Sequence, residues 1–259
     1  MEEMREMNVK GEHILENAKV RDNAQVYDNA QVRGDAMVSD DAVVWEKAVV
    51  KGGARVYGNA LVRDFTDVFE NAQVYGNARV REHAWVYGNA QVCGNAKVFG
   101  RAKVEGDALV EDHAMVSGFA EVRGGRVYEN AYVGGFAKVG GDAQVYGNAV
   151  VTDEALVDDL ARVYGRAKVG GDAWVHENAQ VYGRAKVSGD AVVYGNAGVF
   201  GNAVVNGNAK IGGTAVILGG TWDGSEGEIT EGTWDAPGVP HEEPAPQQSK
   251  LSKLRLVRE

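Results

Sequence analysis

Residues 71–104 read NAQVYGNARVREHAWVYGNAQVCGNAKVFGRAKV. This stretch repeats one unit of six residues, Asn-Ala-x-Val-x-Gly. Val or Ile returns every six residues from Ile14 to Val122, and again from Val127 to Ile217. One residue is missing between the two series. A repeat with so short a period is typical of a solenoid, in which each unit stacks on the next.

Each unit predicts a short strand followed by a corner. In Ala-x-Val the two apolar side chains are two positions apart, so that in a strand they point to the same side. The next residues, as in Tyr75-Gly76-Asn77, favour turns, and we expect both Gly and Asn to supply the positive φ of a sharp corner. An α-helix is excluded, because the period does not fit its turn and because Gly or Asn recurs too often.

A second period, of 18 residues, shows how many units close one coil. It is visible in the residues that follow Val, where aromatic side chains recur at Tyr57 and Tyr75 and at Tyr128, Tyr146, Tyr164, Tyr182 and Phe200. Three units therefore form one coil with three sides. The sequence predicts an all-β fold, a single-stranded parallel β-helix of about 11–12 coils with an aromatic ladder on one edge. Such rings can stack sugars or bases, but stacking on one another explains them more simply.

The unit Val74-Tyr75-Gly76-Asn77-Ala78-Arg79 resembles the hexapeptide repeat of left-handed parallel β-helix proteins, and the resemblance covers residues 14–217. In its consensus sequence the repeat is most similar to uncharacterised bacterial and phage-borne Asn-Ala-x-Val repeat proteins, which suggests a phage or prophage origin. The resemblance implies a left-handed coil, whereas the periodicity alone also fits a right-handed triangular helix such as bactofilin. Acyltransferases and γ-class carbonic anhydrases are common members of the hexapeptide-repeat superfamily, so acyl transfer becomes a candidate activity.

Composition excludes several classes of function. The chain has 259 residues, a net charge of −10 and one cysteine, Cys93. The negative charge disfavours binding to nucleic acid or to an anionic membrane. A single cysteine allows no disulfide within the chain and no cysteine-based zinc site. Residues 1–13 lack the apolar segment of a secretory signal, and no apolar run is long enough to span a membrane, so we expect a cytoplasmic protein without a cofactor.

The chain divides into four parts. We expect residues 1–13 to form an N-terminal cap, since the open end of a β-helix needs cover. Residues 14–217 form the β-helix. In residues 218–236 a Gly-Thr-Trp-Asp sequence occurs twice, and we expect Trp222 and Trp234 to close the C-terminal end. Residues 237–259 hold all the prolines, followed by a basic tail, and we expect a linker there.

Two columns of outward residues are apolar over three successive coils. One column holds Leu156, Trp174 and Val192, and the other holds Met115, Tyr132 and Val150. Exposed apolar strips of this size mark candidate interfaces. Related β-helix enzymes pack side by side as trimers, so we expect a homo-oligomer, with a trimer favoured and the Trp174 strip at or near the interface. The alternative is that the strips bind another protein.

Polar residues offer few candidates for catalysis. His83, His113 and His176 are candidate general bases, because the resemblance implies an exposed histidine between subunits. Their spacing places His83 and His113 on different edges, so a three-histidine metal site within one chain is not expected. We interpret carboxylates such as Asp40, Asp41, Asp158 and Asp159 as solvated residues. The recurring asparagines are interpreted as stacked amides that bond to one another along the axis.

The sequence favours a structural or protein-interaction rod that is not an enzyme and presents a repetitive surface. The unbroken repeat, with no inserted loop that could close over a substrate, supports this interpretation. The first alternative is an acyltransferase-like trimer, which rests on the resemblance. The second is an acidic mimic of nucleic acid, which the mixed charges of the outward columns disfavour.

Overall fold

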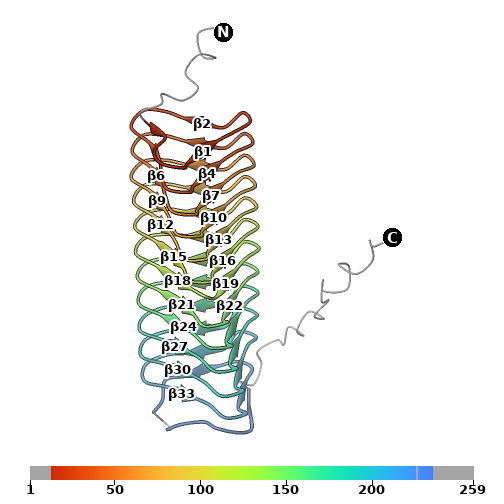
Figure 1. The fold of residues 1–259 in the computed structure, drawn as a ribbon. Coiled ribbons are helices and arrows are strands. Elements are labelled where there is room, and N and C mark those ends of the chain that lie inside the picture. The colour runs from red at the N-terminus through yellow and green to blue at the C-terminus, as the bar shows by residue number, and fades with distance from the viewer. Residues whose placement is uncertain (1–12, 226, 236–259) are drawn as a thin grey trace, which may run out of the picture.

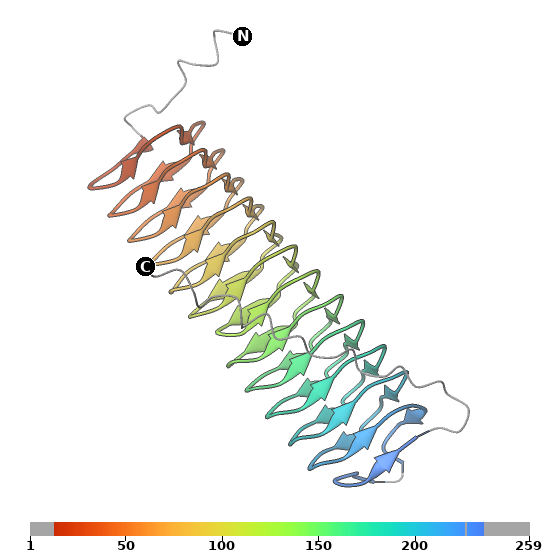
Figure 2. The same cartoon turned by 90° about the vertical axis from the view of Figure 1, so that its right-hand side faces the viewer.

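The computed structural model describes residues 13–225 and 227–235. The linker and basic tail expected for residues 237–259 lie outside the described residues, and so does all of the expected N-terminal cap 1–13 except His13. Within the described part, short strands form three parallel sheets that wind into one straight solenoid of about 12 turns (Figure 1). The rotated view shows the coils stacked at even spacing along one axis (Figure 2). The predicted all-β, three-sided parallel β-helix is confirmed.

From β1 to β35 the strands belong to the sheets in strict rotation, every third strand to the same sheet. β36 then joins sheet 1 beside β34, because the sheet 3 position before it holds only the isolated bridge of Ile229 to Ile211. Sheet 1 contains β1 (Lys19–Val20), β4 (Met37–Val38), β7 (Arg55–Val56), β10 (Gln73–Val74), β13 (Gln91–Val92), β16 (Leu109–Val110), β19 (Arg126–Val127), β22 (Gln144–Val145), β25 (Arg162–Val163), β28 (Gln180–Val181), β31 (Gly198–Val199), β34 (Val216–Ile217) and β36 (Thr233–Trp234).

Sheet 2 contains β2 (Gln25–Val26), β5 (Val43–Val44), β8 (Leu61–Val62), β11 (Arg79–Val80), β14 (Lys97–Val98), β17 (Met115–Val116), β20 (Tyr132–Val133), β23 (Val150–Val151), β26 (Lys168–Val169), β29 (Lys186–Val187), β32 (Val204–Val205) and β35 (Thr221–Trp222). Sheet 3 contains β3 (Gln31–Val32), β6 (Val49–Val50), β9 (Asp67–Val68), β12 (Trp85–Val86), β15 (Lys103–Glu105), β18 (Glu121–Arg123), β21 (Lys138–Gly140), β24 (Leu156–Val157), β27 (Trp174–Val175), β30 (Val192–Val193) and β33 (Lys210–Ile211).

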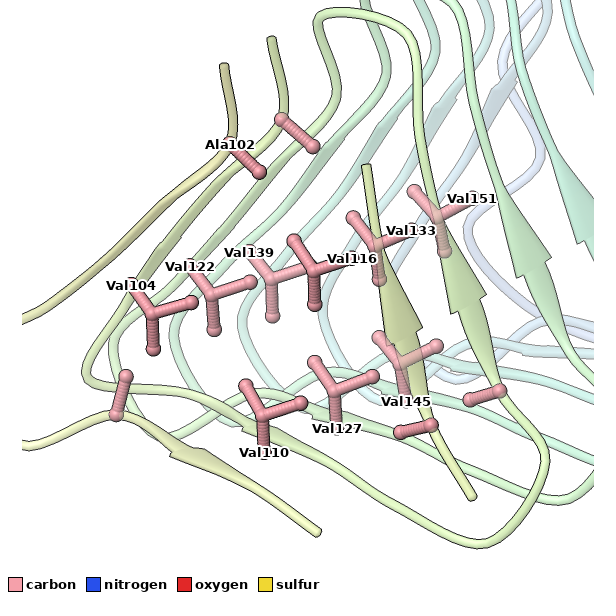
Figure 3. Close-up of a cluster of buried hydrophobic side chains, with 14 of the residues drawn as sticks. Ala102, Val104, Val110, Val116, Val122, Val127, Val133, Val139, Val145 and Val151 are labelled. Atoms are coloured by element: carbon pink, nitrogen blue, oxygen red, sulfur yellow. The ribbon is translucent and has the colours of Figure 1, made fainter. Parts of the chain in front are cut away.

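The core is a continuous column of Val and Ala. Rows of valines from the three sheets point into a common interior, among them Val104, Val110 and Val116 (Figure 3). Thr66 replaces Ala in this column and is fully buried, and its hydroxyl donates to the carbonyl of Arg63. At the C-terminal end Trp222 is buried beside Trp234, with ring centroids 5.6 Å apart. Burial of each Val contributes roughly 1.5–3 kcal/mol before chain entropy is subtracted.

The corners correct the expectation about asparagine. The non-glycine residues with positive φ in the described part are thirteen, and every one is Asp or Glu, with φ between 57° and 68°. Asparagine instead occupies the next position, where its side chain bonds along the axis as predicted. Asn71 donates to Asn89 at 3.4 Å and Asn77 to Asn95 at 3.3 Å.

The acidic corner residues satisfy a backbone group that the strands leave unpaired. At nine corners the carboxylate accepts the N–H of the corner residue one coil further on, at 2.8–3.3 Å. Asp40 accepts from Gly58, and Asp159 accepts from Glu177. These carboxylates lie at the surface, as expected, and in addition accept a backbone hydrogen bond. An N–H without an acceptor in the structure destabilises the fold, and Asp or Glu supplies that acceptor.

Candidate interaction face on sheet 3

The exposed apolar side chains gather on one side of the solenoid. Of the described residues, seven large hydrophobic side chains are between 41% and 55% exposed: Leu15, Phe65, Trp85, Phe119, Phe136, Leu160 and Trp174. All seven lie on sheet 3 or at one of the two corners that border it. Trp85 and Trp174 are in β12 and β27, and Leu15 follows Ile14, which bridges to Val32 of β3. Sheets 1 and 2 therefore have no comparable exposed apolar surface among the described residues.

Three columns of outward side chains cover sheet 3. The corner column lies two residues before each strand and contains Lys47, Phe65, His83, Arg101, Phe119, Phe136, Glu154, Asp172 and Asp190. The central column starts each strand and contains Val49, Asp67, Trp85, Lys103, Glu121, Lys138, Leu156, Trp174 and Val192. The trailing column follows the inward Val and contains Lys51, Phe69, Tyr87, Glu105, Arg123, Gly140, Asp158, His176 and Tyr194.

A shallow hollow lies between the corner and central columns near the middle of the solenoid. Its volume is about 490 Å³, and its lining includes Arg101, Phe119, Phe136 and Glu154 from the corner column. The rings of Phe119 and Phe136 stack at 4.9 Å, and the Arg101 guanidinium lies 5.5 Å from the Phe119 ring. These contacts hold the exposed rings in a fixed orientation, as a binding surface requires.

The predicted strip of Leu156, Trp174 and Val192 lies in the central column of this face, one coil apart each. Trp174 stacks on His176 with ring centroids 4.0 Å apart, and Nδ1 of His176 lies 3.8 Å from a carboxylate oxygen of Asp159. The sequence did not indicate these partners of His176. Trp174 and His176 lie on either side of the inward Val175, and Asp159 comes from the previous coil, so only the folded structure shows that the three side chains meet.

The second predicted strip is on sheet 2, where Met115, Tyr132 and Val150 are paired in register and only half-buried. Tyr132 does not extend outward from this strip. Its ring lies over Gly134, where a Cβ would come within 2.4 Å of the phenol oxygen, and its hydroxyl is 2.8 Å from that of Ser117.

The aromatic ladder runs along sheet 1. Tyr128, Tyr146, Tyr164, Tyr182 and Phe200 stack with centroids 4.6–4.8 Å apart, as the 18-residue period predicts, and Tyr57 stacks on Tyr75 at 4.9 Å. The hydroxyls of Tyr57, Tyr75, Tyr128 and Tyr164 donate to a Gln of the next coil. Burial and the neighbouring hydroxyl of Tyr164 raise the pKa of Tyr182 to about 12. The rings therefore stack on one another, and four of their hydroxyls bond to side chains of the next coil.

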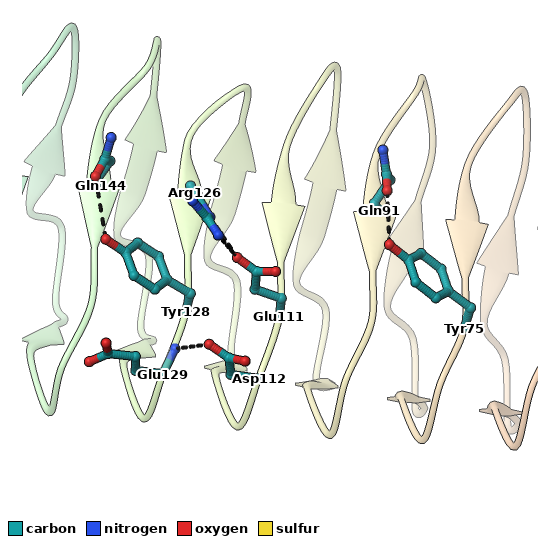
Figure 4. A network of polar contacts seen from close by, with 8 residues as sticks. All are labelled: Tyr75, Gln91, Glu111, Asp112, Arg126, Tyr128, Glu129 and Gln144. Carbon is teal, nitrogen blue, oxygen red and sulfur yellow. Dashed lines mark hydrogen bonds and ion pairs between the residues drawn. The ribbon is translucent and has the colours of Figure 1, made fainter. Parts of the chain in front are cut away.

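The ladder is interrupted where Cys93 and Glu111 take the ring positions. The guanidinium of Arg126 bonds to Glu111 and lies 4.5 Å from the Tyr128 ring (Figure 4). Asp112 accepts the N–H of Glu129 in the same coil, which is 17 residues long instead of 18 (Figure 4). Burial raises the pKa of the Cys93 thiol, which disfavours the reactive thiolate.

The other candidate histidines lie on separate corners. His83 stacks on Phe65 at 5.0 Å, at the corner before sheet 3, and His113 contacts Asn95 at the corner between sheets 1 and 2. In residues 13–225 and 227–235 no cluster of three or more His, Cys, Asp or Glu side chains is placed to hold a metal ion. The same residues contain no helix that could cross a membrane.

Comparison with known proteins agrees with the fold. Three segments, residues 72–89, 143–157 and 179–195, match the family model of the YdcK β-solenoid repeat. The chain is a β-solenoid repeat protein. Each matched segment spans about one coil, so the match identifies the repeating unit rather than a site on its surface. No curated protein matches the chain.

Proposed function

We propose that this β-solenoid is a non-enzymatic interaction rod whose sheet 3 face binds protein. The observation that carries the proposal is the confinement of all seven exposed large hydrophobic side chains to this face and its two corners. Contiguous exposed apolar surface is typical of protein-binding sites, and Trp, Phe and Arg are enriched in them. The strands hydrogen-bond to both neighbouring coils over most of the length, so the face is rigid and loses little entropy on binding.

The proposed binding includes self-association. Leu156, Trp174 and Val192 lie in the central column, and at roughly 4.8 Å per coil the face is on the order of 50 Å long. A flat face of this length can be covered by the same face of a second copy.

A photocrosslinking experiment tests this function. The residue p-benzoylphenylalanine replaces Phe136 on the sheet 3 face in one variant, and Tyr146 of the sheet 1 ladder in a control variant. We expect protein crosslinks from position 136 and none above background from position 146. Equal crosslinking at the two positions, or none at position 136, would overturn the proposal.

A second candidate function is acyltransferase-like catalysis, with His176 as the candidate general base. Its Nδ1 lies 3.8 Å from a carboxylate oxygen of Asp159, an ion-pair distance that is longer than a hydrogen bond. A closer approach of this carboxylate would orient the imidazole as a general base. Transfer of the acetyl group from acetyl-CoA to an acceptor sugar, lost in His176→Ala, would support this alternative. No transfer by the wild type, or equal transfer by the variant, would count against a catalytic role for His176.

A further inference from the structure

The three outward columns of sheet 3 are complementary to the same columns of a second copy when the two solenoid axes run in opposite directions. We propose that two copies pack sheet 3 against sheet 3 in antiparallel orientation, about a two-fold axis that lies in the plane of the face and passes between β18 and β21. The proposal rests on the proposed function of this face and names the partner as a second copy. About such an axis each column faces the same column of the partner, with β18 opposite the partner's β21 and β12 opposite the partner's β27.

The corner column pairs aromatic with aromatic and cation with anion in this arrangement. At the centre Phe119 faces the partner's Phe136, and both rings are among the most exposed apolar groups of the described chain. One coil outward, Arg101 faces the partner's Glu154, and both line the central hollow. One coil further, His83 faces the partner's Asp172. Because of the two-fold symmetry, each of these contacts occurs twice.

In the central column Glu121 faces the partner's Lys138 beside the axis, and Trp85 faces the partner's Trp174 two coils further out. Between them Lys103 faces the partner's Leu156, so that the aliphatic part of the lysine covers an apolar side chain while its ammonium keeps its ion pair with Glu121 at 2.9 Å.

The charges disfavour the two registers in which the axis is displaced by half a coil. If the axis passed through β18, Lys103 would face the partner's Lys138 and Glu121 would face itself. If it passed through β21, Lys138 would face itself. Like charges in contact across an interface are strongly unfavourable.

One like-charge contact occurs in the proposed register, in the trailing column, where Glu105 faces the partner's Asp158. Arg123 lies 4.0 Å from Glu105 and supplies a countercharge there. The contact area agrees with a stable dimer, because eight coils at roughly 4.8 Å and three columns cover on the order of 700 Å² per partner.

A charge exchange between Arg101 and Glu154 tests the pairing. The two residues are three coils apart within one chain, so they meet only across the proposed interface. We expect the wild type to sediment as a dimer and Arg101→Glu and Glu154→Arg each to weaken dimerisation by about tenfold or more. The double variant Arg101→Glu/Glu154→Arg should restore the wild-type association. Single variants that dimerise like the wild type, or a double variant no better than the singles, would refute the pairing.

Disulfide crosslinking tests the orientation in a Cys93→Ala background. Lys103→Cys and Leu156→Cys should form a crosslinked dimer when the two proteins are mixed, and neither should do so alone. Crosslinking of either protein alone would indicate a parallel assembly, such as the expected trimer, and would overturn the proposal. A wild-type monomer at about 50 μM would also overturn it. Photocrosslinks from position 136 to a different protein would then leave the binding function of sheet 3 intact.

A different observation, on sheet 2, carries a second inference. A hollow of about 160 Å³ is lined by four cationic side chains, those of Arg63, Arg79, Arg81 and Lys97, together with Trp45. Arg79 and Lys97 are direct neighbours across β11 and β14, where like charges repel. On sheet 1 the outward column alternates Arg with Gln instead, as in Arg126 and Gln144.

Carboxylates of the described residues balance the four cations unevenly: Arg63 and Arg81 each have one at ion-pair distance, and Arg79 and Lys97 have none. The nearest carboxylates are Asp64 and Glu82, each 3.9 Å from the Nε of the preceding arginine and so beyond hydrogen-bond distance. One oxygen of each already accepts a corner N–H, at 2.8 Å and 2.9 Å. No ion pair joins Arg79 or Lys97 to any described carboxylate. We infer that the hollow binds a tetrahedral oxyanion, the phosphate or sulfate group of a small molecule.

Calorimetry with inorganic phosphate and with sulfate at low ionic strength tests this site and separates the two chemistries. We expect saturable binding of at least one anion and about tenfold weaker binding by Arg79→Gln. Lys168→Gln is the matched control, because Lys168 and Lys186 form the same kind of like-charge pair on sheet 2 outside the hollow. No saturation of either anion below about 10 mM, or equal loss in the control, would overturn the inference.

Discussion

Replacing Gly125 with alanine restores the repeat and should nevertheless destabilise the protein. Gly125 occupies the inward position that Ala fills in nearly every other unit. It lies in the shortened coil, where the corner is tighter. A Cβ added there would lie 2.8 Å from Cγ1 of Val139 and 3.0 Å from the carbonyl oxygen of Ala143. Both contacts are well inside normal van der Waals separation, and the backbone carbonyl has no rotamer through which to move away.

The expected magnitude follows from two opposing effects. An extra carbon in a close-packed core costs about 1–3 kcal/mol. Gly→Ala at a tolerant backbone position stabilises by about 0.4–1 kcal/mol through the unfolded state. The net destabilisation of Gly125→Ala is therefore about 1–2 kcal/mol. In a domain of this size it lowers Tm by roughly 3–8 °C.

Thermal unfolding followed by circular dichroism measures this change. Gly198→Ala is the matched control, since a Cβ at Gly198 would lie 3.7 Å from the Phe200 ring, an ordinary contact. We expect the control to be neutral or slightly stabilised. Equal Tm values for the wild type and Gly125→Ala would refute the argument that the shortened coil requires glycine.

Three further predictions concern the core, the ladder and the corners. Val145→Asp should unfold the coil or cost more than about 4 kcal/mol by urea denaturation, because Val145 is fully buried, whereas Gln144→Glu on the outer side should change stability by less than about 1 kcal/mol. The pKa of Tyr182, about 12 in the folded protein, should fall in Tyr164→Leu, as measured by phenolate absorbance at about 295 nm. Because folding raises this pKa, the tyrosine's contribution to stability is complete below about pH 10 and is lost as the pH rises to about 12. Glu82→Ala should cost about 1–2 kcal/mol, since it removes the acceptor of a corner N–H and keeps a positive φ, whereas Glu82→Gly should recover much of the loss; equal effects in the two variants would contradict this account.

The candidate face could be predicted only in part. The central column was visible from the sequence, because Leu156, Trp174 and Val192 follow one another at the coil period. The corner column was missed, although Phe119 and Phe136 are more exposed than Trp174. Applying the coil period to the position before Ala would have found it. The exposed large hydrophobic side chains on both sides of the one-residue deletion lie on sheet 3 and its corners. This can be seen only when the register of each sheet is corrected for the deletion.

The sequence by itself determined the solenoid, its three sides, the inward Val and Ala and the stacked tyrosines. These follow from local alternation of side chains and from a period that brings identical positions together, and both can be read along the chain. The tertiary structure alone decided which residues adopt positive φ, since Asp40 and Glu82 are selected by an N–H in the next coil rather than by their own neighbours. It also decided which charges meet across coils. Coulomb and hydrogen-bond energies depend on the distances between side chains of different coils, and these distances cannot be obtained from the spacing of residues in the sequence.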